Sequence, residues 1–105
     1  DMFAGQTRLT SDQVHIKAPD IAENGAVVPV TVSSDLKDIE SISLIVSNNA
    51  TPLVASYTFE SGAEPFISTR IKMGKTSEVE AIVKAGGKLY TASKEVKVTI
   101  GGCGG

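Results

Sequence analysis

The chain has few of the residues from which catalytic and metal sites are usually built. It contains one cysteine, one histidine and no tryptophan among 105 residues, and aromatic residues make up 5% of the sequence. One histidine and one cysteine fill too little of the coordination shell of a zinc ion. His15 is also distant in sequence from Cys103, so a Cys–His catalytic pair would depend on the fold to bring the two together. We therefore predict no metal, no cofactor and no catalytic residue.

Other absences exclude classes of partner. The net charge is −2, and no cluster of lysine and arginine with interleaved aromatic residues is present, which argues against binding to nucleic acid. No apolar run is long enough to span a bilayer, so we expect no membrane insertion. No signal peptide is visible, and the chain starts at Asp1 without an initiator methionine, so we expect a processed or trimmed product.

Alternation of apolar and polar residues dominates the sequence, and no stretch sustains a helical period. Turn-forming residues separate the alternating segments, as at Asn24-Gly25, Asn48-Asn49 and Ala85-Gly86-Gly87. Short strands at this spacing predict an all-β, immunoglobulin-like antiparallel β-sandwich that occupies residues 1–100. About seven strands are predicted, over Val14–Ala18, Ala26–Ser33, Glu40–Ser47, Leu53–Phe59, Phe66–Met73, Glu78–Ala85 and Lys88–Ile100.

The alternation also predicts which side chains form the core. The expected inward-facing residues are Val28, Val30, Val32, Ile42, Leu44, Val46, Ile67, Ile71, Met73, Val79, Val83, Val96, Val98 and Ile100. Three apolar residues, Val27, Ile45 and Ile82, fall on the outward parity. They are either scattered surface residues, which are common, or a second apolar face that another subunit covers. Pro29 predicts an edge or a bulge, because it lacks the N–H that a central strand requires.

The C-terminus carries the only cysteine, in the sequence Gly101-Gly102-Cys103-Gly104-Gly105. Glycine has no Cβ and adopts conformations closed to other residues, so residues 101–105 are predicted to form a flexible, narrow arm. From Ile100 to Cys103 an extended chain reaches about 10 Å, at about 3.3–3.6 Å per residue. This arrangement predicts a covalent carrier arm whose thiol enters a pocket on another protein.

The arm supplies nothing that would activate its own thiol. It contains no cation, metal ligand or helix N-terminus that would favour the thiolate. The terminal carboxylate of Gly105, two residues from Cys103, opposes thiolate formation. We therefore expect a thiol that is unreactive in solution and activated only inside the active site of a partner.

Several other functions share this ending. The tail would also suit an inert terminus or a labelling handle, or an intermolecular disulfide that cross-links a structural immunoglobulin-like assembly domain. A redox-sensing thiol is a further alternative. Gly104-Gly105 also resembles the end of ubiquitin-like sulfur carriers, which activate the carboxylate of the last glycine, but those folds pack a helix on the sheet and none is predicted here.

Two motifs resemble the SoxY family, the sulfur-carrier subunits of the bacterial Sox thiosulfate-oxidation system. One is the terminal Gly101–Gly105, and the other is Ala22-Glu23-Asn24-Gly25-Ala26-Val27-Val28-Pro29-Val30-Thr31-Val32. The segments Ser68–Met73 and Lys94–Ile100 are similar as well, and the likeness runs from about residue 14 to the end. Family members generally have an additional N-terminal helical segment, of which residues 1–12 are expected to be a remnant.

The resemblance implies a non-catalytic carrier that works in the bacterial periplasm, paired with a SoxZ-like subunit. Cys103 would be the covalent attachment point for sulfur intermediates, and Gly101, Gly102, Gly104 and Gly105 would give the arm its flexibility. A haem c enzyme would couple thiosulfate to the thiol, and a dimanganese hydrolase would release sulfate. A sulfane dehydrogenase or another sulfur acceptor would take the remaining sulfur. Val27, Ile45 and Ile82 become candidates for the partner interface, although a homo-oligomer would use the same surface.

Overall fold

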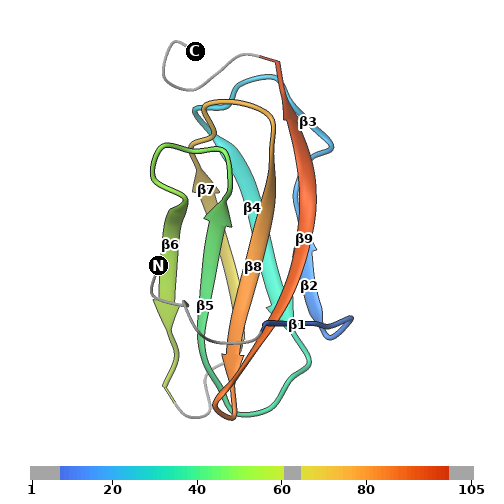
Figure 1. Cartoon of the computed structure of the whole chain (residues 1–105), viewed down its shortest axis with the longest axis vertical. Helices are drawn as coiled ribbons and strands as arrows, with labels where there is room; N and C mark the ends of the chain where they lie inside the picture. The colour runs from blue at the N-terminus through green and yellow to red at the C-terminus, as the bar shows by residue number, and fades with distance from the viewer. Residues whose placement is uncertain (1–7, 61–64, 100–105) are drawn as a thin grey trace.

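The computed structural model describes residues 8–60 and 65–99, and within these ranges it is a sandwich of two β-sheets (Figure 1). The larger sheet has six strands in the order β1-β9-β8-β5-β6, with β3 paired to β9 as well, and the smaller has the order β2-β4-β7. The strands are β1 (Arg8–Thr10), β2 (Val14–Lys17), β3 (Ile21–Ala22), β4 (Val28–Ser34), β5 (Ile39–Val46), β6 (Leu53–Thr58), β7 (Phe66–Ile71), β8 (Ser77–Ala85) and β9 (Lys88–Val98). The predicted all-β sandwich is confirmed, as are the seven predicted strands within a few residues at their ends.

Two strands were not predicted, and both change the topology. β1 and β3 pair in parallel with β9, whereas all the other pairs are antiparallel. β1 contains three residues and β3 two, too few for alternation to be recognised in the sequence. β1 also lies in residues 1–12, where we expected a helical remnant; residues 8–10 are a strand, and residues 1–7 lie outside the described residues.

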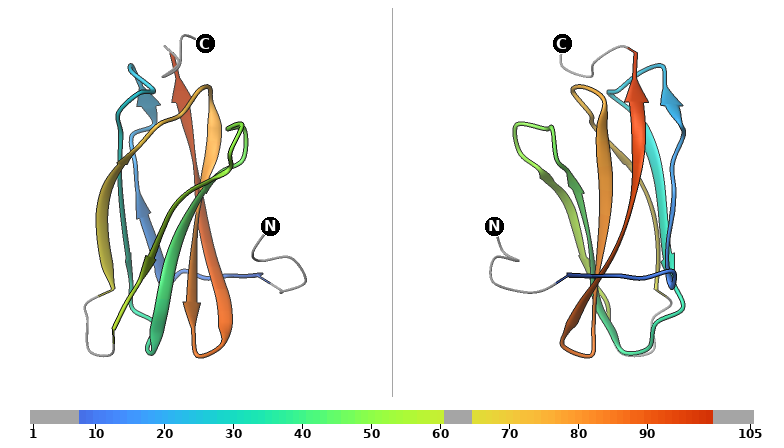
Figure 2. Two further views of the ribbon diagram at one scale, coloured as in Figure 1. Left: turned by 90° about the vertical axis from the view of Figure 1, so that its left-hand side faces the viewer. Right: turned by 45° about the vertical axis from the view of Figure 1, so that its right-hand side comes forward.

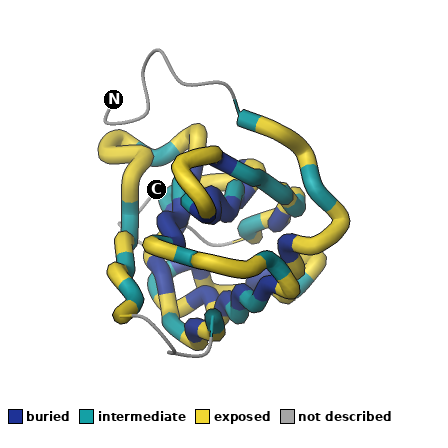
Figure 3. The backbone as a smooth tube through the Cα atoms, turned by 90° about the horizontal axis from the view of Figure 1, so that it is seen from below, coloured by how far each residue is buried: buried dark blue, intermediate teal, exposed yellow. Residues whose placement is uncertain are grey.

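The core lies between the two sheets, as the end-on view shows (Figures 2 and 3). Every predicted core residue that the structure describes is buried, apart from Val98, which is partly buried and packs against the cluster. Burial of the apolar side chains in this core is the main source of stability for a domain of this size. Ile100 lies outside the described residues.

Two predicted local features are found where the sequence placed them. Gly86 and Gly87 both have positive φ, at 57° and 78°, and connect β8 to β9 through the pair Ala85–Lys88. Such a two-residue turn with positive φ at both positions matches the twist of the strands that it joins. Pro29 pairs with Arg70 of β7, and the pairing of β2 with β4 ends at Thr31, so β4 has a locally open edge at the proline.

Within the described residues, no helix is long and apolar enough to cross a membrane.

Candidate functional site at the end of strand β9

The predicted attachment site and the arm glycines lie outside the described residues, but the segment from which the arm leaves is described. β9 runs through Val98 to one end of the sandwich, at the top of Figure 1. The loops β3–β4, β5–β6 and β7–β8 are at the same end (Figures 1 and 2). The contacts that hold the end of β9 therefore determine where the predicted arm leaves the domain.

Hydrogen bonds hold the backbone up to Thr99. The short strand β3 pairs with β9 through Ile21↔Lys97 and Ala22↔Val98. The Thr99 N–H donates to the carbonyl of Ala22 at 3.1 Å, and its hydroxyl lies 3.4 Å from the carbonyl of Glu23. On the other side, the Val98 N–H donates to the Thr76 hydroxyl at 2.9 Å. Two separate segments thus fix the chain immediately before the arm begins.

An ion pair adds to this attachment. The Lys94 ammonium lies 2.9 Å from a carboxylate oxygen of Asp20, and the Asp20 carbonyl accepts a hydrogen bond from the N–H of Lys97 at 3.0 Å. The hydrogen bond and the positive charge of Lys94 hold the pKa of the Asp20 carboxyl below its ordinary value of 3.8. The pair therefore ties the start of β3 to β9.

This lowered pKa gives a pH prediction. A carboxyl whose pKa is lower in the folded state stabilises the fold above its unfolded pKa, and the contribution disappears as the pH falls through the folded value. In a carboxyl ¹³C NMR titration, Asp20 is expected to titrate below 3.8, and Lys94→Met to return it towards that value. Lys97→Met, on the same strand, is the control and should leave the midpoint unchanged. An unchanged midpoint in Lys94→Met would contradict the assignment.

An open groove of about 720 Å³ lies beside this attachment point. Its walls come from the β5–β6 loop, the start of β6, the end of β7 and the β7–β8 loop. Three exposed cationic side chains, Arg70, Lys72 and Lys75, line it. Among the described residues, none of the three forms an ion pair or a side-chain hydrogen bond. The groove was not predicted from the sequence, where its only signal is the spacing of three cations over residues 70–75 without an intervening acid.

Two asparagines hold the walls of the groove together. The Asn49 amide donates to the carbonyl of Lys72 at 2.8 Å and accepts from the N–H of Gly74 at 3.2 Å. The side-chain amide of Asn48 donates to the carbonyl of Thr76 at 2.9 Å, and the backbone N–H of Asn48 donates to the Ser77 hydroxyl at 3.1 Å. The predicted turn at Asn48-Asn49 therefore also clamps the β7–β8 loop, so the groove is already formed in the free domain.

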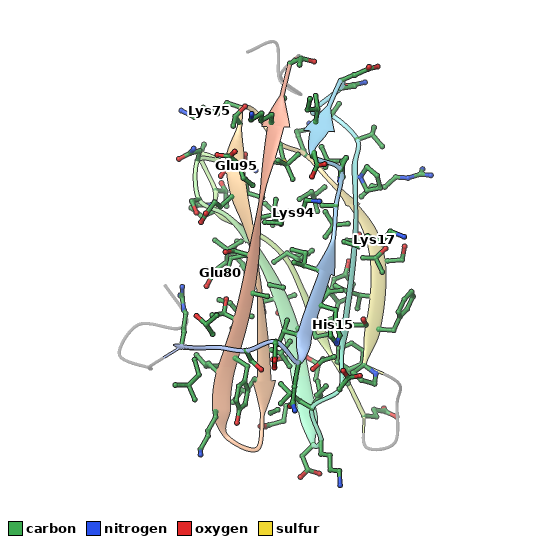
Figure 4. The ribbon with its side chains drawn as sticks, turned by 90° about the vertical axis from the view of Figure 1, so that its right-hand side faces the viewer. His15, Lys17, Lys75, Glu80, Lys94 and Glu95 are labelled. Carbon is green, nitrogen blue, oxygen red and sulfur yellow. The ribbon has the colours of Figure 1, made fainter. Side chains whose placement is uncertain are left out.

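Both broad faces of the sandwich carry charged side chains. Lys17 and Arg70 are exposed on the smaller sheet, and Lys72 is exposed in the loop that follows β7. Glu78, Glu80 and Glu95 lie on the larger one, together with the cations Arg8, Lys84 and Lys97. Figure 4 shows Glu80 and Glu95 on the side away from Lys17. Glu80 is bound to Arg8 at 3.2 Å and to the Thr91 hydroxyl at 2.7 Å.

The three predicted interface residues do not form one surface. Val27 precedes β4 of the smaller sheet and is 50% exposed, whereas Ile45 and Ile82 belong to strands of the larger sheet. Ile45 is partly buried. Ile82 is 1% exposed and packs with Leu89 and Ile45 in a second, smaller cluster, so its prediction as an exposed contact was wrong. The role of Val27 and Ile45 in binding a partner stays a prediction.

His15 of β2 pairs with an acidic side chain at the surface of the domain. Its Nε2 lies 2.7 Å from a carboxylate oxygen of Asp35, and both side chains are at least half exposed. Within residues 8–60 and 65–99, no group of three or more histidines, cysteines or carboxylates is positioned to hold a metal ion.

Comparison with known proteins gives one family. The family described as "Sulfur oxidation protein SoxY" matches residues 1–103. The solved structure of the sulfur carrier protein SoxY from Chlorobium limicola f thiosulfatophilum is 44% identical, with a TM-score of 0.84. The match covers 94% of this chain and 90% of that one.

A second solved structure shares the fold alone. A superoxide reductase (neelaredoxin) from Ignicoccus hospitalis has a TM-score of 0.74 at 22% identity, over 87% of this chain and 94% of that one. No curated protein matches the chain. Since the family match spans residues 1–103 and the Chlorobium structure agrees over nearly the whole domain, the chain belongs to the SoxY family of sulfur oxidation proteins.

Proposed function

We propose that this protein is a carrier of sulfur intermediates in thiosulfate oxidation, not an enzyme, and that Cys103 is the attachment point. The family and the Chlorobium sulfur carrier support the role. The assignment to Cys103 rests on the contrast between the anchored backbone up to Thr99 and the glycine-rich sequence after it. The backbone is held by β3 and Thr76 up to that residue, and the sequence that follows Ile100 is four glycines around the only cysteine.

The proposed chemistry begins with an oxidation at the thiol. A haem c enzyme joins the Cys103 sulfur to the terminal sulfur of thiosulfate, which forms an S–S bond and gives a cysteine S-thiosulfonate. The thiol proton is released, and the two electrons pass to the haem enzyme. The haem enzyme would also activate the thiol, because the sequence of the arm contains no cation that would favour the thiolate.

The second step is a hydrolysis. A dimanganese hydrolase adds water to the terminal sulfonate, the bond between that sulfur and its neighbour breaks, and sulfate leaves. A persulfide stays on Cys103, and its sulfur is either oxidised by a sulfane dehydrogenase or passed to another acceptor. In this proposal the protein works in the bacterial periplasm, paired with a SoxZ-like subunit, and each enzyme receives the arm in turn.

Intact-mass spectrometry tests the carrier role. The protein, paired with its SoxZ-like subunit, is incubated with thiosulfate and the haem c enzyme, and then divided into samples with and without a reductant. We expect a mass increase of one thiosulfate group that maps to the Cys103 peptide and that the reductant removes. If only unmodified chain or a disulfide-linked dimer forms while the enzyme is active, the tail is a cross-link or a bystander and the proposal is wrong.

A further inference from the structure

We propose that Arg70, Lys72 and Lys75, here called the basic rim, dock an acidic surface on the enzymes that receive the arm. This inference rests on the proposed function, since it concerns the partners that act on Cys103. The rim lines the groove at the end of the sandwich where β9 ends, and Figure 4 shows Lys75 at that end. In the described part of the chain no carboxylate neutralises these three side chains.

The rim is joined directly to the base of the arm. Thr76 follows Lys75 in the chain, and its hydroxyl accepts the hydrogen bond from Val98 at 2.9 Å. From Thr99 to Cys103 an extended chain covers about 13–14 Å, at about 3.3–3.6 Å per residue. A protein surface resting on the rim would therefore have the entrance of its pocket within reach of the thiol. Docking at the rim would set both the position and the direction from which the arm enters.

The rim is also prepared for binding before a partner arrives. Asn49 holds the backbone at Lys72 and Gly74, and Asn48 holds it at Thr76, so the segment that carries Lys72 and Lys75 is fixed on both sides. A surface that is already ordered loses less conformational entropy on association than a loop that must be arranged. Even a weak electrostatic contact there would be sufficient to orient an encounter.

The geometry favours a protein surface over a small oxyanion. A tight site for thiosulfate or sulfate needs donors that converge on a small, enclosed volume. This groove is open, at about 720 Å³, and its three cations are exposed. The three cations are spread around an open groove, so they are complementary to carboxylates spread around the entrance of a partner's pocket.

The test is the rate of association with the haem c enzyme, measured by stopped-flow on the protein paired with its SoxZ-like subunit. The variant Lys72→Glu/Lys75→Glu reverses two rim charges. Its control, Lys37→Glu/Lys88→Glu, makes the same change in net charge at two exposed positions near the opposite end of the sandwich. Reversing charges in a docking surface lowers the association rate constant and its dependence on salt.

We expect the rim variant to associate about tenfold more slowly at low ionic strength, a typical size for electrostatic steering, and the control to match the wild type. The difference should disappear at 1 M salt, where the Debye length is about 3 Å. Equal rates in all three proteins, equal slowing in both variants, or slowing that persists at 1 M salt would each overturn the proposal. So would a rim variant that associates normally but needs more thiosulfate for loading, because the groove would then bind the small anion.

The two proposals fail in different ways. The association rate does not depend on whether an adduct forms, and the adduct is read separately by intact mass. A wild-type protein that associates quickly and loses that speed in the rim variant, yet never acquires a mass on Cys103, would refute the carrier function and leave the docking surface standing. A loaded wild type whose rim variant associates at the same rate would refute only the docking surface.

Discussion

Cys103→Ser is expected to abolish the thiosulfate adduct completely, with no loss of fold. A serine hydroxyl cannot form the S–S bond on which the proposed coupling depends, and no second thiol exists in the chain to replace it. The substitution lies four residues beyond Thr99, the last described residue of the anchored segment, so we expect the thermal unfolding curve to match that of the wild type. Intact mass measures the adduct, and reduction of the haem enzyme by thiosulfate measures the coupled electron flow.

Deletion of Gly105 is the matched control for this prediction. The deletion removes the C-terminal glycine whose carboxylate the ubiquitin-like mechanism would activate, and it leaves Cys103 in place. If Cys103 is the attachment point, the deleted protein still carries the adduct and the serine variant does not. The reverse pattern, with an adduct on the serine variant and none after the deletion, would show that the chain works through its carboxylate.

Leu44→Ala is expected to lower the free energy of unfolding by about 2–5 kcal/mol, the range for a buried leucine replaced by alanine. Leu44 is 0% exposed in β5, between β8 and β6 in the larger sheet, and its neighbours in the register, Ala81 and Ala55, are too small to fill the space that it would vacate. Small domains have a total stability of about 5–15 kcal/mol, so this single change would remove a large part of it.

Guanidinium unfolding followed by circular dichroism measures this loss. The midpoint should fall while the slope of free energy against denaturant stays the same, as expected for a change in stability alone. Leu53→Ala in the adjacent strand β6 is the control, because Leu53 is 39% exposed and should cost at most about 1 kcal/mol. Equal losses in the two variants would mean that the core does not lie where the structure places it.

Much of the fold is readable from the sequence because alternation reports burial on one face of a strand. Val28, Val30 and Val32 alternate with exposed or half-exposed residues, and all three are buried. Alternation is lost in β8, where Ala81, Ile82 and Val83 are buried in succession. A strand covered on both faces has no alternation to detect, so Ile82 was assigned to an exposed surface.

The candidate site also has one part that the sequence indicates and another that it does not. The carrier arm stays a prediction from composition, which is extreme and local, with one thiol among four glycines outside the described residues. The basic rim and its clamp cannot be predicted in this way, since they depend on loops that are distant in the chain. Asn49 contacts Lys72 and Gly74 across more than twenty residues, and no pattern of short range relates them. The parallel strand β3, which holds the base of the arm, depends on a contact with β9 from the other end of the chain.

The pairing of β1 and β3 with β9 has a consequence for how the protein behaves at high concentration. Both short strands bind the same long side of β9, at Leu89–Thr91 and at Lys97–Val98, and leave only its middle uncovered. An exposed strand of eleven residues would be a template on which a second molecule could continue the sheet. Here the open interval is short, and Lys94, paired with Asp20, projects from it. The β9 edge is thereby protected from continuing its sheet into a second molecule.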